Sequence, residues 1–166
     1  MMPSPESARA ASFSVFQWGK ILGEISLPPA AQHGAAELAQ QHFDQAEALD
    51  FSGTEVEDYL PPASMESRWE WFPYDRVREL GFEPVSRNKE AVYGTVGVGM
   101  HEDDMFGPCF ILTLFNDGLC FRMKDQEHVT AVGQWFILDD RQPHEVQETE
   151  DSTTYLVWSV PLRELA

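Results

Sequence analysis

The amino-acid sequence predicts a mainly β protein with N-terminal helices, an α+β architecture within one domain of 166 residues. Two observations lead to this fold class. Between 31 and 49, apolar residues recur at steps of three and four, which is the period of one helix face. After 89, β-branched and aromatic residues alternate with small or polar ones, and turn signals recur at short intervals. Several short strands with tight turns indicate an antiparallel sandwich or barrel, one sheet of which the helices would cover.

Composition divides the chain into three parts. Residues 1–12 are small and polar, and we expect them to form a flexible leader. We expect 13–88 to form a mostly helical cover, in which FSVFQWGKIL at 13–22 supplies a first strand or a turn of helix. Residues 89–162 would form the β core and carry the functional site.

The helical part has one long element and one short one. The apolar face of the long helix consists of Ala31, Ala35, Leu38, His42, Ala46 and Leu49. Pro28 and Pro29 suit the start of that helix, and DFSGT at 50–54 suits its end. Pro61, Pro62 and Pro73 exclude one continuous helix between 55 and 86. A short helix from Tyr74 to Leu80, stopped by Gly81, is the regular element expected there.

The β part is expected to contain short strands separated by turn sequences. The predicted strands are 91–100, 109–115, 119–124, 128–131, 134–139, 145–148 and 153–160. The turn sequences are NDG at 116–118, VGQ at 132–134, DDRQP at 139–143 and TEDS at 149–152. Asp139 and Asp140 fall in one of these turns, where Asp is favoured for local hydrogen bonding.

The net charge of −17 limits the function classes. Phosphate backbones are bound by clustered Lys and Arg, so the charge disfavours direct nucleic-acid binding. It suits solubility, or an acidic surface that binds a basic protein partner in place of nucleic acid. Without a long apolar run or a signal-peptide pattern, we expect a soluble cytoplasmic protein that does not bind membranes. In that compartment Cys109 and Cys120, which flank a predicted hairpin, would be free thiols.

The stretch GVGMHEDDMFG at 97–107 contains a candidate metal site. Residues two apart on an extended chain project to the same face, so His101 and Asp103 would point at one centre. His144, directly after an apolar strand, is the best third ligand. Two imidazoles and one carboxylate form the ligand set of non-haem Fe(II) oxygenases. If the strand bulges, Asp104 replaces Asp103, and His128, which opens a predicted strand, is an alternative ligand.

At this point the sequence resembles the Fe(II)- and 2-oxoglutarate-dependent oxygenases, within the wider cupin-like superfamily. The resemblance covers 91–160 and rests on MHEDDMFGPCFILTLFNDG, VGQWFILDDRQPHEV and TTYLVWSV. It implies a double-stranded β-helix, or jelly roll, covered on one side by helices. It also implies Fe(II) held by His101, Asp103 and His144, with 2-oxoglutarate as cosubstrate of a dioxygenase. Such a protein would hydroxylate a small molecule or a peptide.

One feature departs from that family. The strand after the distal His, STTYLVWSV, contains no basic residue to bind the distal carboxylate of 2-oxoglutarate. Charge-assisted pairing would then come from Arg122, Lys124 or Arg141.

Candidate substrate contacts are Tyr93, Arg122 and Trp69. Trp69 belongs to an aromatic cluster that could equally pack a helix against a sheet. His33 and His42 have no spaced partners on the predicted helix, and we expect both at the surface.

Two other functions stay open from the sequence. One is a non-catalytic acidic binding or inhibitor protein on the same scaffold. The absence of an Arg from the strand after His144 favours it. The other is a cupin-type metalloenzyme that does not use 2-oxoglutarate.

Overall fold

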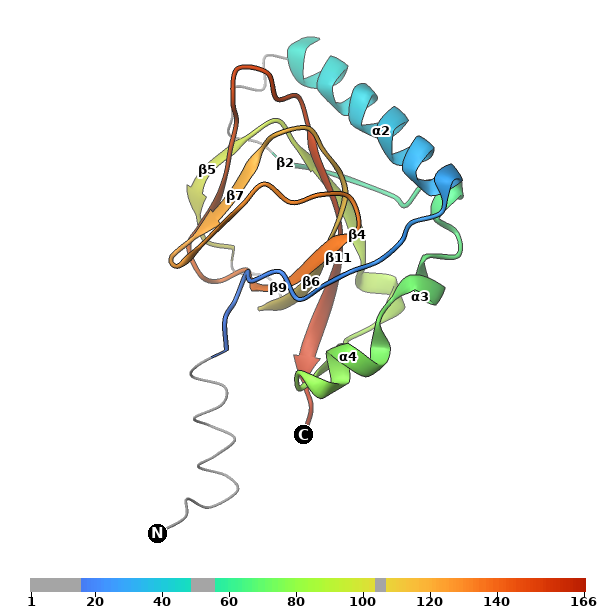
Figure 1. Ribbon diagram of the computed structural model, residues 1–166, viewed down its shortest axis with the longest axis vertical. Coiled ribbons are helices and arrows are strands. Elements are labelled where there is room, and N and C mark those ends of the chain that lie inside the picture. The colour runs from blue at the N-terminus through green and yellow to red at the C-terminus, as the bar shows by residue number, and fades with distance from the viewer. Residues whose placement is uncertain (1–15, 49–55, 104–106) are drawn as a thin grey trace.

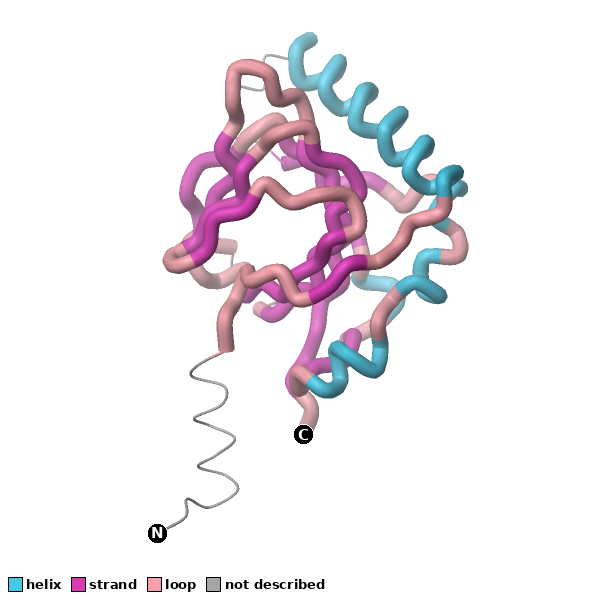
Figure 2. Tube along the Cα trace, in the orientation of Figure 1, coloured by secondary structure: helices cyan, strands magenta, loops and turns pink. Residues whose placement is uncertain are grey.

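The computed structural model describes residues 16–48, 56–103 and 107–166, and the predicted leader 1–12 lies outside them. Two antiparallel sheets lie face to face, and the helices gather on one side of them (Figures 1 and 2). This is the mainly β architecture with N-terminal helices that the sequence predicts.

The larger sheet follows the order β1-β9-β6-β11-β4-β2, with β3 paired to the end of β11. Its strands are β1 (Gly23–Glu24), β2 (Val56–Tyr59), β3 (Phe82–Pro84), β4 (Ala91–Thr95), β6 (Pro108–Asn116), β9 (Gln134–Asp139) and β11 (Tyr155–Glu164). The smaller sheet follows the order β5-β10-β7-β8. Its strands are β5 (Val98–His101), β7 (Cys120–Met123), β8 (Gln126–His128) and β10 (His144–Gln147).

The strand order identifies the predicted jelly roll. Along the chain from β4 to β11, the path crosses between the two sheets after β4, β5, β6, β8, β9 and β10. The first and last of these strands pair with each other, as do the second and the second-last. That nesting of two Greek keys is the double-stranded β-helix.

Alternation along β6 explains why its sequence is almost continuously apolar. Phe110, Leu112 and Leu114 belong to the cluster that packs beneath the helices, whereas Cys109 and Ile111 belong to the cluster between the sheets. Successive side chains on a strand point to opposite faces, so a strand covered on both faces must be apolar at every position.

The helices lie on the outer face of the larger sheet. They are α2 (Pro29–Ala48), α3 (Arg68–Trp71) and α4 (Tyr74–Glu79), with short 3-10 turns η1 (Ala63–Met65) and η2 (Arg87–Lys89). The predicted long helix and the predicted short helix are thereby confirmed as α2 and α4. Gly81 follows α4 with φ +96°, a conformation that favours glycine and ends the helix.

A buried ion pair fastens α3 to the sheet. The Arg68 guanidinium donates two hydrogen bonds to Glu90, one from Nε at 2.7 Å, and a third to the Met65 carbonyl at 3.1 Å. The Trp158 indole N–H donates to the same Glu90 carboxylate. Trp69 packs edge-on against Trp158, with ring centroids 5.1 Å apart. Core packing is therefore what Trp69 does in this fold.

His42 is buried, which corrects its predicted surface position. It is 1% exposed on the inner face of α2, and its Nδ1 lies 2.6 Å from the Tyr59 hydroxyl on β2. The alanines on the same face of α2 pack against the rest of the protein, so the helix turns this face inward and buries His42 with them. The apolar periodicity of the helix therefore decided the position of His42, and its polarity did not. His33 is exposed, and its Nε2 lies 2.9 Å from Glu37.

Several predicted element boundaries are wrong. The strand predicted at 91–100 is two strands, because the chain turns at Gly97, with φ +133°, and changes sheet. The strand predicted at 128–131 instead covers Gln126–His128. Between 16 and 22 the chain forms neither helix nor strand, although the Gly19 and Leu22 N–H groups bond to carbonyls of β9. The expected helical cover, 13–88, also contributes β1, β2 and β3.

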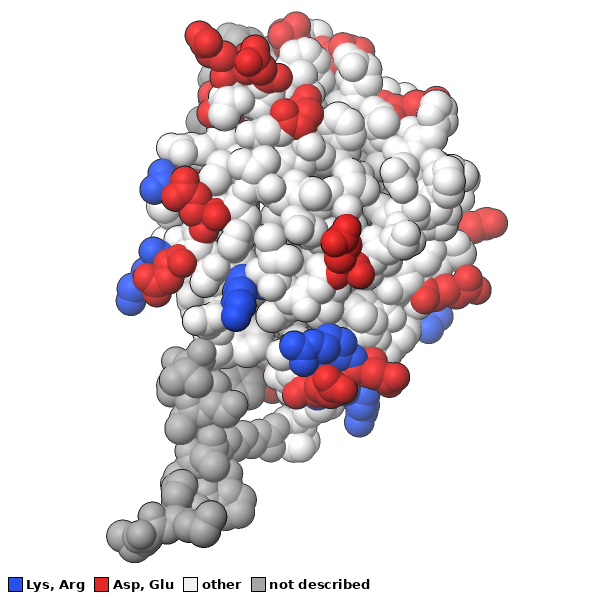
Figure 3. All heavy atoms as spheres, viewed as in Figure 1, with Lys and Arg blue, Asp and Glu red and all other residues white. Residues whose placement is uncertain are grey.

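Charge is unevenly distributed over the surface. On the face shown in Figure 3, acidic side chains crowd the upper end, and Lys and Arg lie lower down beside acids. Of the helices in the described residues, none combines the length and the hydropathy that crossing a bilayer requires.

Candidate metal site

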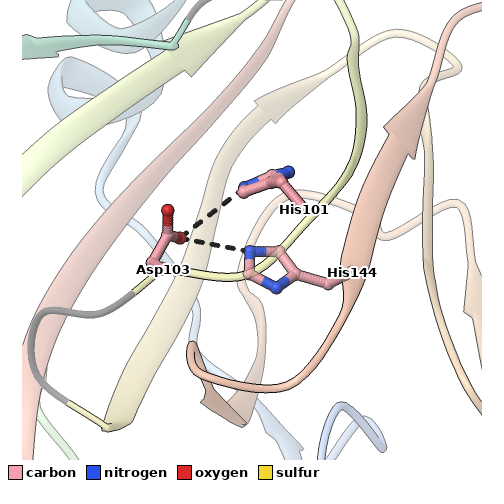
Figure 4. A group of neighbouring side chains, drawn as sticks. All are labelled: His101, Asp103 and His144. Carbon is pink, nitrogen blue, oxygen red and sulfur yellow. Dashed lines mark ion pairs between the residues drawn. The ribbon is translucent and has the colours of Figure 1, made fainter.

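Two neighbouring strands of the smaller sheet bring the predicted ligands together. His144 opens β10 and lies directly opposite His101, the last residue of β5. Asp103 follows two residues after His101, where the chain leaves the sheet. Figure 4 shows the three side chains converging, with the carboxylate facing both imidazoles.

The distances suit a bound divalent ion. The Asp103 Oδ2 atom lies 3.6 Å from His101 Nε2 and 3.4 Å from His144 Nε2. One ligand atom from each residue lies within 4.8 Å of the other two. Adjacent ligand atoms around an ion with bonds of about 2.0–2.2 Å are separated by about 3 Å. The two distances from Asp103 Oδ2 would therefore have to shorten only slightly for the three atoms to bind one ion. Two nitrogen donors and one oxygen donor on one side of an ion leave its other positions open.

Backbone carbonyls fix the orientation of both imidazoles. The Nδ1 atom of His101 lies 2.7 Å from the Gly99 carbonyl, and that of His144 lies 2.8 Å from the Gln142 carbonyl. A carbonyl oxygen only accepts, so each Nδ1 carries the hydrogen and each Nε2 presents a lone pair to the centre. Such bonds are the usual support of metal-binding histidines.

The two imidazoles differ in exposure. Burial lowers the pKa of His144, and the nearby His101 lowers it further, against the opposing effects of Gln142 and of Asp103. Neutral imidazole is the form that binds a metal ion, so the surroundings of His144 favour ligation at neutral pH. The Asp103 side chain is 43% exposed, which leaves the centre accessible from solvent.

Asp140 ties the loop that carries Asp103 to the end of β9. Its carbonyl accepts the Asp103 N–H at 2.7 Å, and its own N–H donates to the Gly107 carbonyl at 3.0 Å. Its Oδ1 accepts the Gly107 N–H at 2.8 Å, across 33 residues of sequence. Asp139 has the expected local role in the turn, because it accepts hydrogen bonds from Arg141. Asp140 instead makes the long-range hydrogen bonds described above.

The candidate ligands lie at the wall of a cavity of about 230 Å³ between the two sheets. Most of its wall is apolar. The apolar side chains are Val56, Val98, Ile111, Phe121, Phe136, Leu138, Val146 and Val157. The polar side chains, besides the three ligands and Asp140, are Tyr93, Thr95, Cys109, Tyr155 and Ser159. Burial raises the pKa of the Cys109 thiol to about 12, and nearby carboxylates including Asp140 add to the effect, so it stays protonated.

Among the described residues that line the cavity, there is no Lys or Arg. The predicted carboxylate-binding residues lie elsewhere. Arg122 pairs with Glu145 at 3.3 Å on the outer face of the smaller sheet, and Arg141 pairs with Asp139 at 3.0 Å. Lys124 follows β7 and is exposed. None of the three lines the cavity. Alternation along β7 turns Phe121 inward and Arg122 outward, and Arg141 is paired with Asp139 in the turn after β9.

The predicted substrate contacts divide in the same way. Tyr93, a predicted substrate contact, lines the cavity, whereas Arg122 does not. Trp69 lies on the opposite side of the larger sheet, in the cluster beneath the helices. His128 is on β8, with its Nε2 atom 3.0 Å from the Gln126 side chain, and it does not join the ligand group. Asp104 lies outside the described residues. Cys109 and Cys120 are free thiols, as expected.

Sequence reasoning missed most of the cavity wall. Phe136, Leu138 and Val157 alternate with residues that face the helices, and the middle of β9 (135–138) and of β11 (155–158) is apolar enough to suit either face. The signal available was period two counted from Asp140, which lines the cavity at the end of β9. Counting back in steps of two from Asp140 along β9 yields Leu138 and Phe136.

Fold and site together define a protein class, a double-stranded β-helix, or jelly roll, with a candidate site for one metal ion. No family model matches the chain, and no curated protein matches it. Among solved structures, the chain is similar to a cupin-2 domain containing protein from Shewanella frigidimarina NCIMB 400. The identity is 10%, the TM-score is 0.33, and the match covers 58% of this chain and 97% of the other. The fold assignment itself rests on the strand order described above.

Proposed function

We propose that this protein is a metal-dependent enzyme, of the non-haem iron oxygenase type, that acts on a small molecule without 2-oxoglutarate. One observation carries the proposal. His101, Asp103 and His144 converge at the wall of an apolar cavity whose described lining contains no Lys or Arg. The first half of that observation supports a metal centre, and the second half argues against a dicarboxylate cosubstrate.

The chain's own residues would perform three tasks. His101, Asp103 and His144 would hold the ion, and Fe(II) bound there would supply open positions and redox chemistry for a substrate and O2. Backbone carbonyls would keep each Nε2 aimed at the centre. The apolar wall would exclude water and hold the substrate beside the ion.

The runner-up is the Fe(II)- and 2-oxoglutarate-dependent dioxygenase. Its ligand set is the same, so the ligands alone do not separate the two functions. A carboxylate moved into the cavity without a basic partner would lose its hydration uncompensated. The hydroxyl groups of Tyr93 and Ser159 are the described lining groups that could receive it.

Metal titration tests the proposal. Anaerobic titration with Fe(II), and with Co(II) as a spectroscopic substitute, should saturate at one ion per chain. His144→Ala should weaken that binding at least about 100-fold, because it removes a direct ligand and leaves two. His128→Ala is the matched control, since His128 is half-buried in the same sheet but lies outside the ligand group. Equal binding by all three proteins would contradict the proposed centre.

The same anaerobic Fe(II) protein tests whether 2-oxoglutarate is a cosubstrate. Addition of 2-oxoglutarate to the anaerobic Fe(II) protein should produce no visible charge-transfer band from a chelated keto acid. A band that appears in the wild type and is lost in His144→Ala would make the runner-up the better account. If no metal binds at all, the acidic binding protein becomes the leading function.

A further inference from the structure

The cavity is elongated, and the candidate metal ligands occupy one end of it. Tyr155 and Ser159 both line it from β11, and four residues of extended chain span about 13 Å. Ser159 lies beside Cys109, and Cys109 lies near Asp140 and the candidate ligand Asp103. Tyr155 lies at the far end, opposite Thr95 and Asn116. A ligand that fills the cavity therefore extends away from the ion.

The middle of the cavity offers carbon atoms and no charge. Ile111, Phe136 and Val157 line it from the larger sheet, and Phe121 lines it from the smaller sheet, with its ring centroid 4.7 Å from that of Phe136. All four side chains are at most 8% exposed. A ligand segment held there gains free energy by leaving water in proportion to its own apolar area.

The far end contains hydroxyl groups that are already bonded within the protein. The Tyr155 hydroxyl accepts from Thr130 at 3.1 Å and lies 3.4 Å from the Thr113 hydroxyl. Thr95 Oγ1 accepts the Gly97 N–H at 3.0 Å. Charges in the lining belong to Asp103 and Asp140, both at the metal end and both negative. An anionic group at the far end would therefore meet no countercharge among the described lining residues.

From this arrangement we propose that the substrate is an uncharged molecule with a metal-chelating polar head and a narrow apolar tail that extends from the ion toward Tyr155. The inference rests on the proposed metal-dependent function for its head and on the cavity wall alone for its tail. The volume of about 230 Å³ lies below the roughly 300–1,000 Å³ of drug-sized ligand pockets, so the tail is short.

A homologous series of probes tests the head and tail together. Straight-chain alkyl hydroxamic acids, from acetohydroxamic acid upward, chelate through the head and differ only in the tail. On the Co(II)-loaded protein, each added methylene should tighten binding about fourfold, which corresponds to ~0.8 kcal/mol, until the tail fills the cavity. Suberic acid monohydroxamate, with a carboxylate at the tail end, should bind at least about tenfold more weakly than octanohydroxamic acid.

A substitution in the middle of the wall should shorten the accepted tail. Val157→Phe should leave acetohydroxamic acid binding unchanged and stop the methylene gain at a shorter chain. Val146→Phe, on the opposite sheet, provides a second such variant if Val157→Phe does not fold. Val129→Phe is the matched control, because Val129 is 60% exposed and does not line the cavity. Affinity that is independent of chain length, or that favours the carboxylate tail, would overturn the proposal.

A metal-free arm separates this inference from the metal centre. In the metal-free protein, 1-hexanol should shift the methyl NMR signals of Ile111 and Val157, and Val146→Phe should abolish the shift of Ile111. If metal binding fails but these shifts occur, the proposed function falls and the apolar tail site stands. If metal binds and the shifts do not occur, the tail site is wrong and the metal centre stands.

Discussion

Asp140 joins the two segments that supply the candidate ligands, although it is not a ligand itself. Its three hydrogen bonds hold the residues on either side of 104–106 against the end of β9, four residues before His144. The position of the Asp103 carboxylate relative to His144 therefore depends on Asp140. Residues that orient metal ligands in this way commonly change metal affinity by about 10–100-fold.

Two substitutions at Asp140 separate its hydrogen bond from its charge. Asp140→Ala removes the acceptor for the Gly107 N–H and should weaken Co(II) binding about 10–100-fold, with an altered visible Co(II) spectrum. Asp140→Asn keeps an acceptor oxygen and should retain the spectrum, with a smaller loss of affinity from the lost negative charge. Asp139→Asn, next in sequence but paired with Arg141, is the control. If Asp140→Ala leaves both spectrum and affinity unchanged, the residue does not position Asp103.

His42 makes the stability of the protein depend on pH. Burial lowers the pKa of His42, and its Nε2 has no hydrogen-bond partner among the described residues. Its other nitrogen contacts Tyr59, whose pKa burial raises, with a further contribution from Glu57. The folded protein therefore favours neutral His42, whereas the unfolded chain protonates it near the ordinary value of about 6.5.

The expected change follows from proton binding in the two states. Below pH 6.5 the unfolded chain binds the proton first, so the free energy of unfolding falls by up to about 1.4 kcal/mol per pH unit. The loss continues until the pH falls through the lowered pKa of the folded state, and above 6.5 this contribution is constant. Urea unfolding of His42→Gln should show a shallower slope between pH 6.5 and 5 than wild type. His33→Gln, at an exposed site, should keep the wild-type slope, and an unchanged slope in His42→Gln would contradict the assignment.

At the scale of elements, the Arg68–Glu90 ion pair determines how α3 docks on the larger sheet. The Glu90 side chain is 7% exposed and accepts hydrogen bonds from both Arg68 and Trp158. Removing one member of a buried pair leaves the other charged and unpaired, which costs about 3–5 kcal/mol. Replacing both members by apolar residues of similar volume avoids that cost.

Glu90→Ala should therefore lower the free energy of unfolding by about 3 kcal/mol in urea titrations, and Glu90→Gln should cost less because its amide oxygen still accepts. The double variant Arg68→Met with Glu90→Leu should be more stable than Glu90→Ala. Glu83→Ala is the comparison at a solvent-screened pair with Arg163 and should change stability by less than about 1 kcal/mol. A loss in Glu90→Ala no larger than that of Glu83→Ala would show that the pair does not fasten α3.

Elements were predictable where local pattern and tertiary structure agree. Strand β9 has the predicted bounds 134–139, and β10 begins one residue earlier than expected. The division of 91–100 into β4 and β5 depends on a change of sheet at Gly97, which a run of small and β-branched residues does not encode. Strands β2 and β3 are four and three residues long, and only their pairing with β4 and β11 defines them.

At the scale of the whole molecule, the convergence of the three candidate ligands was predictable and their surroundings were not. His101, Asp103 and His144 carry side chains whose chemistry is specific, and the strand period restricts which of them share a face. The direction of Arg122 and the location of Trp69 depend instead on which face of a sheet becomes the interior. That choice is made by packing across the entire fold, so the sequence pattern left open whether Arg122 and Trp69 contact a substrate.

The alternation along β6 has a consequence for how this protein can change. Phe110 and Leu112 pack in the helix-covered core, whereas Cys109 and Ile111, which alternate with them in sequence, line the cavity. Neighbouring positions on one strand therefore affect two different properties, the packing of the core and the shape of the cavity. Substitutions at the cavity positions can change which ligand is bound while the core positions stay the same. A library of variants confined to the cavity face would therefore vary ligand preference and largely preserve the fold.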